Sequence, residues 1–379
     1  MVAARTIVVA YILAGVGHKR AAEAIAAALQ ARGQTMVHVV DVLDYLPAWL
    51  RWLIPRLYLI CVHYLPWLWA ISFYLTDRPW IERVTGEFRR WSNRRLAHRF
   101  LQWLQQVQPE VLICTHFLPS EIVGPWKMSQ LPHLHVWNVV TDYRPHAWWI
   151  APGVDHYFVG LHETQAALEQ RGVPAARITV SGIPVSNVFY RAGDRAALRR
   201  QYDVHPTRFT LLITSGGFGV GPMERLITTL ERSASGLHAV LQLVIVAGSN
   251  PRLEGRLKER AARSPFPISV VGFTSAMHEL MAMADVIVTK PGGLTVTEAL
   301  AVGRPLILFS PIWGQETGNA EVLLRRGAAQ LLRRPDDLGD IIERWVREPQ
   351  VFRAVCARSL SVLPHDAATT MISEALHAH

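Results

Sequence analysis

The chain has 379 residues, of which 50% are hydrophobic, and it carries a formal net charge of +9. That length corresponds to about two domains, and the apolar share is enough for ordinary globular cores. The three cysteines are Cys61, Cys114 and Cys356. Their spacing excludes a CxxC-type metal or redox site, so we interpret them as reduced cytosolic thiols.

The predicted elements alternate between strand and helix from the first residues onward. An apolar, β-branched run at 6–13 predicts a buried strand instead of a signal peptide, and an alanine-rich helix follows at 19–31. A region rich in tryptophan and arginine then fills 45–106. The other elements expected in this half are strands at 35–43, 111–116, 133–142, 155–160 and 178–184, and a helix at 161–172.

The tryptophan- and arginine-rich region carries most of the positive charge. Residues 1–100 hold thirteen Lys and Arg against six Asp and Glu, and seven arginines lie within 78–99. A basic face of this kind attracts nucleic acid or anionic lipid. Six of the thirteen tryptophans lie within 49–91 of this region. Basic residues interleaved with tryptophan and leucine, without a recognition module, make nucleic acid the weaker interpretation.

Residues 57–75 carry no formal charge, a length that just reaches that of a membrane-spanning helix. Pro66 and His63 interrupt this run, and tryptophan beside arginine is typical of the membrane interface. We favour an interfacial or acceptor-binding segment over a buried helical hairpin, and both over a spanning helix. The residues expected at the membrane interface are Trp67, Trp69, Arg89 and Arg90.

A second series of strands and helices begins after a polar linker near 181–207. The strands expected here are 209–214, 241–249, 268–273, 285–290 and 305–312, and a last helix covers 365–378. Alternation of this kind predicts parallel sheets covered by helices. The fold class is therefore α/β, with two doubly wound domains.

Ligands of such sheets bind beyond the carboxyl ends of the strands. Glycine-rich turns follow the strands at 14–18, 215–221, 272–274, 291–293 and 314–318. Four of these five turns belong to the second half. The second half is therefore the better candidate for binding a phosphate-bearing ligand.

The turn SGGFGVG at 215–221 joins a strand to a helix, where backbone N–H groups can approach an anion. It lacks the GK[ST] of a nucleoside-triphosphate P-loop. We favour diphosphate binding by Gly216 and Gly217 over a merely flexible turn.

The block 288–305 places Lys290, Gly292 and Gly293 at a turn before a helix, so Lys290 and the turn amides could bind phosphate. Thr295 and Glu298 lie near the first turn of that helix, and Glu298 could accept hydrogen bonds from a ribose diol. The alternative is that both are capping residues. In the loop that follows, the side chains suited to hexose hydroxyls are Gln315, Glu316 and Asn319, although the loop alone could be an ordinary polar one.

These residues carry a resemblance to a known family. The sequence KPGGLTVTEALAVGRPLILFSPIWGQETGNAEVLLRRGAA at 290–329 resembles the donor-sugar signature of glycosyltransferase family 28. The first half resembles the lipid-acceptor domain of the monogalactosyldiacylglycerol synthase and processive diacylglycerol glucosyltransferase group. The stretches that carry this resemblance are AGVGHKRAAEAI at 14–25, VVDVLD at 39–44 and VTDYRPHAWWIAPGVDHYFV at 140–159.

The resemblance implies two facing Rossmann-like domains of the glycosyltransferase B type, with a ligand cleft between them. The implied domains are an acceptor domain at 1–185 with a membrane-interface segment at 45–99, a donor domain at 186–362, and a C-terminal helix in 363–379 that packs back toward the first domain. It also implies an inverting reaction with no cofactor beyond the UDP-sugar substrate.

By motif position, the resemblance places Glu298 at the ribose, and Gly216, Gly217 and Thr295 near the diphosphate. Gln315 and Glu316 would meet the sugar, and the loop of Gly272, Phe273 and Thr274 would meet the base.

Transfer to an alcohol needs a base near the acceptor hydroxyl. His18 is our leading candidate, because it follows a glycine turn at the end of a strand and histidine titrates near neutral pH. Asp142 is the second candidate for a catalytic role, and Gly17, His116 and His146 are expected on the acceptor side. The family's turn is usually GGGH, whereas this chain has Val16 in it, which adds bulk where the acceptor would approach.

The expected function is transfer of a hexose from a UDP-sugar to a lipid hydroxyl, of the diacylglycerol type, by a cytoplasmic enzyme bound to the inner face of the cell membrane. The alternatives are a polyprenyl-linked acceptor, a nucleotide-sugar 2-epimerase, and a nucleotide-sugar-binding protein without turnover. An epimerase would not need a membrane-facing segment.

Overall fold

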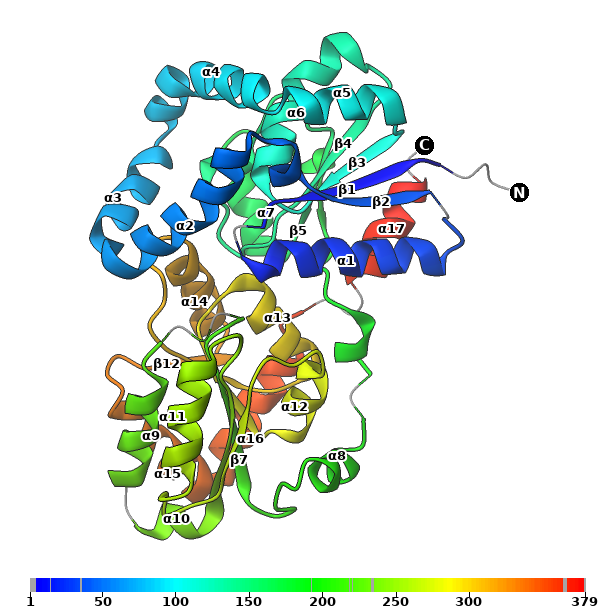
Figure 1. Cartoon of the computed structure of the whole chain (residues 1–379). Coiled ribbons are helices and arrows are strands. Elements are labelled where there is room, and N and C mark those ends of the chain that lie inside the picture. Colours follow the sequence, from blue (N-terminus) through cyan, green and yellow to red (C-terminus); the bar gives the residue numbers. More distant parts are fainter. Residues whose placement is uncertain are drawn as a thin grey trace. The chain divides into compact units, whose positions relative to one another are not determined.

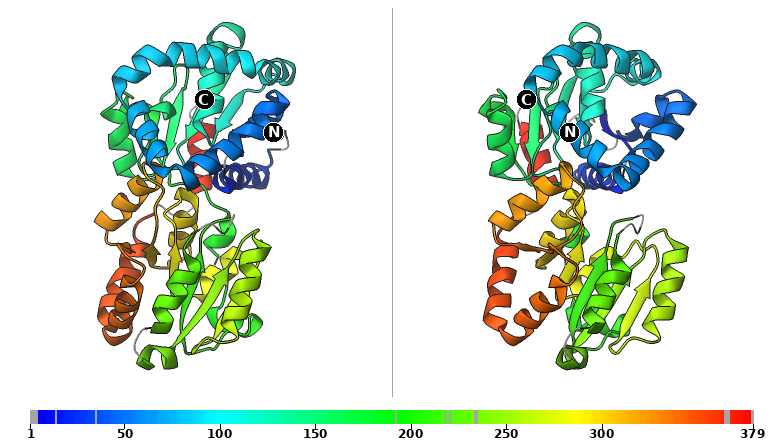
Figure 2. Two further views of the ribbon diagram at one scale, coloured as in Figure 1. Left: turned by 60° about the vertical axis from the view of Figure 1, so that its left-hand side comes forward. Right: turned by 90° about the vertical axis from the view of Figure 1, so that its left-hand side faces the viewer.

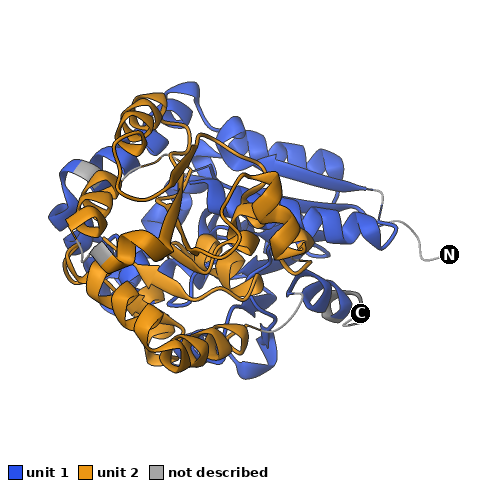
Figure 3. Cartoon of the chain, turned by 90° about the horizontal axis from the view of Figure 1, so that it is seen from below, with its two compact units in different colours: residues 1–186, 312–318, 364–379 blue, residues 187–311, 319–363 orange. Residues whose placement is uncertain are grey.

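The computed structural model describes residues 5–13, 15–34, 36–191, 193–217, 219, 221–232, 235–363 and 367–377. It divides into two compact units, coloured separately in Figure 3. Unit 1 comprises Met1–Ser186, Ile312–Gly318 and Pro364–His379, and unit 2 comprises Asn187–Pro311 and Asn319–Leu363. Unit 1 thus includes the short segment 312–318, which the sequence had suggested as part of the donor domain.

Unit 1 is an α/β unit built around a six-stranded parallel sheet (Figure 1). Its strands are β1 (Ile7–Tyr11), β2 (Val37–Asp41), β3 (Val111–Cys114), β4 (His135–Val139), β5 (His156–Val159) and β6 (Ile178–Val180). Its helices are α1 (Val16–Ala31), α2 (Ala48–Tyr64), α3 (Pro66–Thr76), α4 (Pro79–Leu96), α5 (His98–Val107), α6 (Phe117–Gln130), α7 (His162–Glu169) and α17 (Ala367–His377), with 3₁₀ turns η1 (Val42–Tyr45), η2 (Ala147–Trp149) and η3 (Ala175–Arg177).

The apolar runs of the strands are continuous because both faces of this sheet are covered. Successive side chains point to opposite faces. In β1, Ile7 and Val9 therefore pack with α1 and α17 on one face, whereas Val8 and Ala10 pack with α5 and α6 on the other. Helices α1 and α17 lie side by side although they come from opposite ends of the chain (Figure 1).

Helices α2, α3 and α4 follow one another around one side of unit 1 (Figure 2). They do not form the buried hairpin that was one interpretation of the sequence, because Trp49, Trp52 and Trp67 each leave more than half of their surface exposed. Within the described residues, no single helix is long and apolar enough to cross a membrane. Residues Ala48–Val62 and Pro66–Thr76 meet that test only as a pair, bent by 108°.

Unit 2 is a second α/β unit with a six-stranded parallel sheet. Its strands are β7 (Phe209–Thr214), β8 (Leu241–Val246), β9 (Ile268–Val271), β10 (Val286–Thr289), β11 (Leu306–Leu308) and β12 (Ala329–Leu331). Its helices are η4 (Asn187–Phe189), α8 (Arg195–Gln201), α9 (Met223–Arg232), α10 (Ser235–Val240), α11 (Pro251–Ala261), α12 (Met277–Met283), α13 (Gly293–Ala301), α14 (Gln315–Arg325), α15 (Asp337–Arg347) and α16 (Pro349–Leu360). The first four residues of α14 belong to unit 1.

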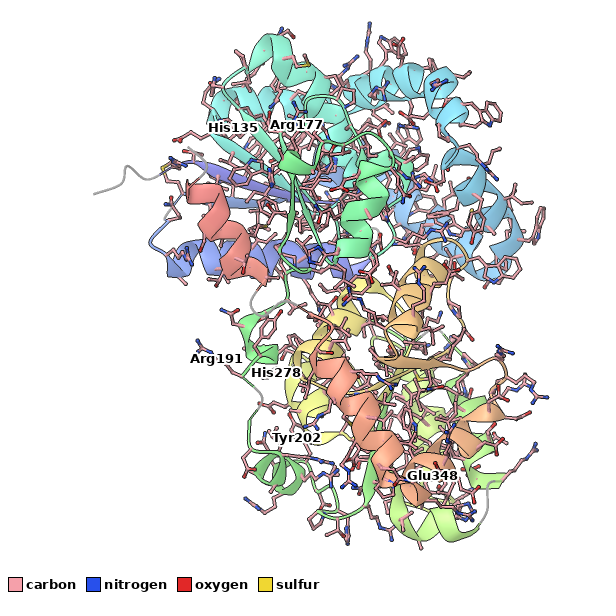
Figure 4. The ribbon with its side chains drawn as sticks, turned by 180° about the vertical axis from the view of Figure 1, so that it is seen from behind. His135, Arg177, Arg191, Tyr202, His278 and Glu348 are labelled. Atoms are coloured by element: carbon pink, nitrogen blue, oxygen red, sulfur yellow. The ribbon has the colours of Figure 1, made fainter. Side chains whose placement is uncertain are left out.

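Tyr202 and His278, both labelled in Figure 4, contact other elements of unit 2. Tyr202, just after α8, donates a hydrogen bond of 2.5 Å to Glu279 of α12, and His278 of α12 contacts the ring of Phe189 at 6.0 Å. In unit 1, His135 and Arg177 mark the amino ends of β4 and β6 in the same figure. The carboxyl ends, where ligands of such sheets bind, lie at the opposite edge.

The order of the strands identifies one special position in each sheet. Unit 1 has the order β2-β1-β3-β4-β5-β6, and unit 2 has the order β12-β11-β10-β7-β8-β9. The direction in which the chain adds strands reverses between β1 and β3 in unit 1, and between β7 and β10 in unit 2. A crevice opens beyond the carboxyl ends of the strands at such a switch point, and it is where doubly wound sheets bind ligands.

The structure confirms the predicted fold class of two parallel sheets covered by helices. Eleven strands agree with the sequence prediction, but β12 is absent from it because only three residues form this edge strand. Helix α1 begins at Val16, three residues earlier than expected. The residues Val16, Gly17 and His18 therefore form the first turn of a helix.

Candidate functional site

The switch point of unit 1 brings His18 together with the residues that follow β3 and β4. His18 lies in the first turn of α1, directly after β1, and β3 pairs in parallel with β1. Thr115 and His116 follow β3, while Thr141 and Asp142 follow β4. Gly17 and His116, expected on the acceptor side, and Asp142, the second candidate for a catalytic role, therefore come from the same edge of one sheet.

The imidazole of His18 is fixed by two hydrogen bonds to this edge. Its Nδ1 lies 2.7 Å from the carbonyl oxygen of Thr115 and 3.2 Å from Oγ1 of Thr141. The Thr115 hydroxyl in turn donates to the carbonyl of His18 at 2.9 Å. Because a carbonyl can only accept, the His18 Nδ1 carries the proton, and Nε2 is left as the basic nitrogen.

Burial lowers the pKa of His18, and the nearby carboxylate of Asp142 and the Thr115 carbonyl partly oppose that shift. The ring is therefore neutral at pH 7 and can accept a proton at Nε2. Two features of a general base, the correct tautomer and a neutral resting state, follow from the same surroundings.

The other two histidines are less suited to proton transfer. His116 is the N-cap of α6, and its Nδ1 accepts a hydrogen bond from the Leu118 amide at 3.1 Å. Burial and the neighbouring His18 hold the pKa of His116 well below its usual value. The two rings meet edge to face at 4.7 Å. In His116 the free lone pair of the neutral ring is thus already used.

His146 uses both of its ring nitrogens within the fold. Its Nδ1 accepts from the Trp148 amide at 3.2 Å, and its Nε2 donates to the Phe73 carbonyl at 3.1 Å. Burial lowers the pKa of His146 as well. This histidine therefore ties the end of α3 to the loop after β4, a structural task.

Asp142 lies beside a segment that is distant in sequence. The Gln315 amide nitrogen is 3.2 Å from each carboxylate oxygen of Asp142. Gln315, expected at the donor sugar, thus contacts the acceptor-side carboxylate within unit 1. Burial, followed by the charges of Glu316 and Asp142, raises the pKa of the Tyr58 phenol.

The loop that carries Gln315 and Glu316 needs its two glycines for packing. A Cβ on Gly314 would lie 2.4 Å from the ring of Phe73, and one on Gly318 would lie 2.7 Å from the side chain of Arg144. Glu316 accepts a hydrogen bond from the Ile312 amide at 2.8 Å. Glu316 therefore caps the start of α14, and this role is separate from the contact with the sugar expected from the sequence.

Val16 imposes no strain on the turn in which it replaces the family's glycine. Gly15, the N-cap of α1, has φ of −172°, which is extended backbone that any residue adopts, and Val16 is already helical. Ala14 lies outside the described residues. The bulk of Val16 therefore affects what approaches the turn, and leaves its backbone conformation unchanged.

The switch point of unit 2 contains two buried hydroxyl groups without a partner. Ser215 directly follows β7, and Thr289 is the last residue of the neighbouring strand β10. Within the part of the chain that the structure describes, neither hydroxyl has a hydrogen-bond partner. Buried polar groups are rarely left unpaired. The switch point of unit 2 is thus suited to receiving a polar ligand.

The glycines of 215–221 have different tasks. A Cβ on Gly219 would lie 2.1 Å from the carbonyl oxygen of Ala247, which belongs to the loop after β8. Position 219 therefore requires glycine. Gly216 has φ of +79° and open space around it, so its backbone is free to approach a ligand. Gly217 accepts hydrogen bonds from Ser249 through its carbonyl. The flexible-turn interpretation therefore accounts for part of this loop only.

The turn after β10 leads into α13, whose N-cap is Gly292. Lys290 comes next to Ser215, since a Cβ on Gly221 would lie 3.3 Å from the Ser215 Cβ and 3.6 Å from the Lys290 Cε. Helix α13 presents its amino end at the switch point, where its amides and dipole favour an anion. Gly293 is the first residue of this helix and is buried.

Other residues expected at the donor are arranged around α13. Glu298 is buried in this helix, whereas Thr295 is partly exposed. Asn319 is fully buried and donates to the Pro291 carbonyl at 3.1 Å. Asn319 therefore supports the turn after β10, and its contact with a hexose stays a prediction.

The loop after β9 lies at the edge of the sheet of unit 2. Phe273 is 67% exposed, so its ring is open to stacking. Thr274 instead accepts a hydrogen bond from the Ala276 amide at 3.0 Å, which leads the chain into α12. Phe273 is accordingly the better candidate of the two for contact with a base.

The four residues expected at a membrane interface differ in exposure. Trp67 is 56% exposed, but Trp69 is partly buried and packs edge to face on Tyr58 at 5.3 Å. The guanidinium groups of Arg89 and Arg90 pair with Glu82 at 2.9 and 2.7 Å. Arg89 also pairs with the buried Glu121 at 2.5 Å. Both arginines thus have partners in the chain, which reduces their attraction for lipid.

Sequence reasoning missed five residues of the two switch points and their surroundings: Tyr58, Thr115, Thr141, Ser215 and Thr289. The three threonines and the serine follow or end strands that were predicted, so their place at the carboxyl edge was a usable signal. Tyr58 gave no such signal, because it lies in a helix among many aromatic residues.

Comparison with known proteins agrees with this architecture. One similar structure is WaaG, described as a glycosyltransferase involved in lipopolysaccharide biosynthesis. The match covers 98% of this chain and 100% of WaaG, with 12% sequence identity and a TM-score of 0.58. It is also similar to Anabaena Alr3699/HepE in complex with UDP, with 99% and 100% of the two chains covered, 14% identity and a TM-score of 0.60.

The sequence comparisons are more specific. Residues 18–185 match the family described as monogalactosyldiacylglycerol (MGDG) synthase, and residues 210–348 match the glycosyltransferase family 28 C-terminal domain. Among curated relatives, the processive diacylglycerol beta-glucosyltransferase of Bacillus licheniformis is 29% identical over 271 residues, which are 71% of this chain and 68% of the relative.

Two doubly wound sheets with a polar cluster at each switch point, together with these matches, define a glycosyltransferase with the glycosyltransferase B fold. More narrowly, the chain belongs to glycosyltransferase family 28, in the group of monogalactosyldiacylglycerol synthases and processive diacylglycerol glucosyltransferases. The family that the sequence motifs suggested is thereby confirmed.

Proposed function

We propose that the protein is an inverting glycosyltransferase that moves a hexose from a UDP-sugar to a hydroxyl group of a diacylglycerol-type lipid. The name of the curated relatives supports the acceptor and the hexose, and the UDP in the HepE structure supports the donor. The observation that carries the transfer chemistry is His18, a neutral imidazole at a switch point, with Nδ1 bonded at 2.7 Å and Nε2 left basic.

In the proposed reaction, unit 2 binds the nucleotide-sugar. The hydroxyls of Ser215 and Thr289 gain a partner in the diphosphate, and the amino end of α13 and Lys290 stabilise the negative charge that grows as UDP leaves. Glu298 binds the ribose diol, and the loop of Phe273 contacts the base. Gly216 allows the backbone to approach the diphosphate.

Unit 1 supplies the acceptor and the base. A lipid hydroxyl oxygen attacks the anomeric carbon, forming the new C–O bond while the bond from that carbon to the diphosphate oxygen breaks. The hydroxyl proton passes to the Nε2 of His18, and UDP departs with the electron pair. A single displacement of this kind inverts the anomeric configuration. Thr115 and Thr141 act as positioning residues, because they hold the ring through its other nitrogen.

Association with the membrane is the third part of the proposal. Helices α2 and α3 expose apolar and aromatic side chains where a lipid acceptor is extracted: Trp49, Trp52, Leu57, Ile60, Tyr64, Trp67, Leu68 and Ile71. Exposed apolar patches of this extent mark interaction surfaces. We propose a peripheral enzyme on the cytoplasmic face of the membrane.

The membrane part is tested by sedimentation with anionic liposomes. Replacing Trp52 and Trp67 by Ala is expected to release the protein, whereas replacing the ion-paired Arg89 and Arg90 by Gln should have the smaller effect. Undiminished sedimentation of the tryptophan variant would remove the interfacial role of α2 and α3.

The reaction itself is tested by incubating the protein with a panel of radiolabelled UDP-sugars and native lipid extract, followed by identification of the product. A glycosylated diacylglycerol is expected. A labelled polyprenyl-linked product would change the acceptor, and an epimerised sugar without acceptor would indicate a 2-epimerase. Tight UDP-sugar binding with no product from any lipid would indicate a binding protein without turnover.

A further inference from the structure

The carboxylate of Asp142 is held by an amide that comes from a distant part of the chain. Asp142 is buried, and it follows β4 at the carboxyl edge of the sheet of unit 1. The Gln315 Nε2 lies 3.2 Å from each of its two oxygens. Gln315 belongs to the segment Ile312–Gly318, which is part of unit 1 although it follows β11 of unit 2 in the chain. The proposed transfer reaction gives this contact no task.

The hydrogen-bonding character of the two groups fixes the orientation of the Gln315 amide. An ionised carboxylate only accepts hydrogen bonds, whereas an amide has a donating NH2 group and an accepting carbonyl oxygen. The NH2 group of Gln315 must face Asp142, because a turned amide would bring its carbonyl oxygen against two carboxylate oxygens. The Gln315 Oε1 is therefore directed away from Asp142, and it makes no hydrogen bond with the described residues of the chain.

The backbone around Gln315 is held on both sides of this residue. The Thr317 hydroxyl accepts a hydrogen bond from the Gly314 amide and donates one to the Gly314 carbonyl, each at 3.0 Å. Glu316, the next residue, accepts from the Ile312 amide at 2.8 Å. Gln315 is thus presented by a segment whose own hydrogen bonds fix it, which is the arrangement of a preorganised binding residue.

Two consecutive residues of one loop hold both the base and this amide. Thr141 contacts the Nδ1 of His18 at 3.2 Å, and Asp142, the next residue, contacts Gln315. The base and the Gln315 carbonyl oxygen are therefore fixed relative to each other. The sugar must be placed where the deprotonated acceptor attacks it, and a hexose offers hydroxyl hydrogens around its ring. An accepting oxygen that is fixed relative to the base is suited to one of these hydroxyls.

We propose that Asp142 is a positioning residue for the donor sugar: it orients Gln315 so that the amide oxygen accepts a hydrogen bond from a hexose hydroxyl. This role rests on the proposed function, in which the ligand is a UDP-hexose. It gives Asp142 a task other than proton transfer, and it gives the site a preference that can be measured. A ring substituent that cannot donate a hydrogen bond, such as fluorine, is disfavoured where the oriented carbonyl oxygen faces it.

The test measures the affinity of the full chain for UDP, UDP-glucose and UDP-galactose by calorimetry, together with analogues fluorinated in turn at each hydroxyl-bearing carbon of the hexose. Asp142→Asn keeps the size of the side chain, but an asparagine can also donate to the Gln315 Oε1, so the amide is no longer held in one orientation. Gln315→Glu places two carboxyl groups against each other. Asp142→Asn combined with Gln315→Glu restores a donor facing a carboxylate, and it again presents an accepting oxygen to the sugar.

The matched control is a second pair in unit 1, Gln165 and Glu169 on α7. Here too an amide nitrogen donates to a carboxylate, at 2.9 Å, but the pair is exposed. Gln165→Glu, alone and combined with Glu169→Gln, changes the same chemical groups as the variants at Gln315 and Asp142. Both control variants should leave every affinity unchanged.

We expect the wild type to bind one fluorinated analogue about five- to tenfold more weakly than the parent UDP-hexose, because one hydrogen bond is lost. Asp142→Asn should reduce this discrimination to about twofold or less, since a freely turning amide can donate to fluorine as well. Gln315→Glu should weaken UDP-hexose binding about tenfold through repulsion within the pair, and the added Asp142→Asn should recover most of that loss. The affinity for UDP should stay constant throughout, and in turnover Asp142→Asn should raise KM for the UDP-hexose more than it lowers kcat.

Unchanged discrimination among the fluorinated sugars in Asp142→Asn would overturn this role, and so would an equal loss of affinity for UDP and UDP-hexose. Lost turnover in that variant with every affinity retained would make Asp142 a catalytic residue instead. If Gln315→Glu fails to fold, the discrimination by Asp142→Asn decides. A wild type that discriminates among the sugars but transfers none would support the role of Asp142 and contradict the transfer reaction. A wild type that binds no UDP-sugar would contradict both.

Discussion

The switch points of the two units differ in how far their polar groups are already satisfied. In unit 1, His18 is held at its Nδ1, His116 uses its Nδ1 as a helix cap, and His146 uses both ring nitrogens. In unit 2, the hydroxyls of Ser215 and Thr289 are buried without a partner among the described residues. One site is arranged in advance around a single basic nitrogen, and the other keeps open hydrogen bonds for a ligand to complete.

This contrast has a physical meaning. A buried hydroxyl without a hydrogen-bond partner destabilises the fold by about 1–3 kcal/mol. A bound ligand that supplies the missing hydrogen bond removes this destabilisation. A base, by comparison, gains from being held in one tautomer before the substrate arrives. The difference therefore fits the proposed function, in which unit 2 binds the nucleotide-sugar and unit 1 carries out proton transfer.

The largest expected effect tests the assignment of proton transfer. His18→Ala should lower kcat by about 10²- to 10⁴-fold, because general-base catalysis contributes that much. The affinity for UDP, measured by calorimetry, should stay the same. His133→Ala, which changes an exposed histidine, is the matched control. Turnover at the wild-type rate in the His18 variant would remove the base assignment.

The next effect tests the open hydrogen bonds of unit 2. Ser215→Ala together with Thr289→Val should weaken UDP binding by about tenfold, since two hydrogen bonds to the charged diphosphate are lost. The free energy of unfolding should not fall, because the removed groups had no partner in the described structure.

Thr297→Val provides the contrasting control for stability. The Thr297 hydroxyl is buried and donates to the Gly293 carbonyl at 2.6 Å. Its loss should cost about 1 kcal/mol of unfolding free energy. Equal destabilisation by the Ser215/Thr289 and Thr297 variants in denaturant titrations would contradict the view that the first two hydroxyls are unsatisfied.

A smaller effect concerns pH. Since burial lowers the pKa of His18 below 6.5, kcat/KM should be constant near neutral pH and should fall only on the acid side of 6.5, as the ring is protonated. Asp142 raises this pKa, so Asp142→Asn should move the acid limb to still lower pH. A limb that moves upward, or loss of activity at every pH, would transfer the catalytic role to Asp142.

The smallest effect concerns the altered glycine turn. Val16 is already helical and Gly15 is extended, so Val16→Gly should change the unfolding free energy by less than about 1 kcal/mol. Turnover with the lipid acceptor should change by no more than a few-fold. A large gain in turnover would show that Val16 obstructs the acceptor.

Much of this account could be predicted from the sequence because it rests on local patterns. Apolar strands and the glycine turns after them indicated both sheets and the residues at their carboxyl edges, including His18 and Lys290. The motif at 290–329 indicated the family. The short edge strand β12 escaped prediction because three residues carry too little pattern.

The contacts that refine the site could not be predicted in the same way. The bond between Gln315 and Asp142 joins residues 173 positions apart, and that between His18 and Thr115 joins residues 97 positions apart. Within the described residues, Glu82 pairs with Arg89 and Arg90, whereas no carboxylate pairs with Arg94 or Arg95. Composition gave all seven arginines the same weight, whereas the fold separates them.

The most direct test of the central claim compares the wild type with the His18→Asn variant, supplied with UDP-glucose or UDP-galactose and diacylglycerol in mixed micelles. The anomeric configuration of the product is read by NMR, and UDP binding is measured in parallel. The account predicts a β-linked glycolipid from the α-linked donor in the wild type, and UDP binding without product in the variant. Retained configuration, or equal turnover in both proteins, would contradict it.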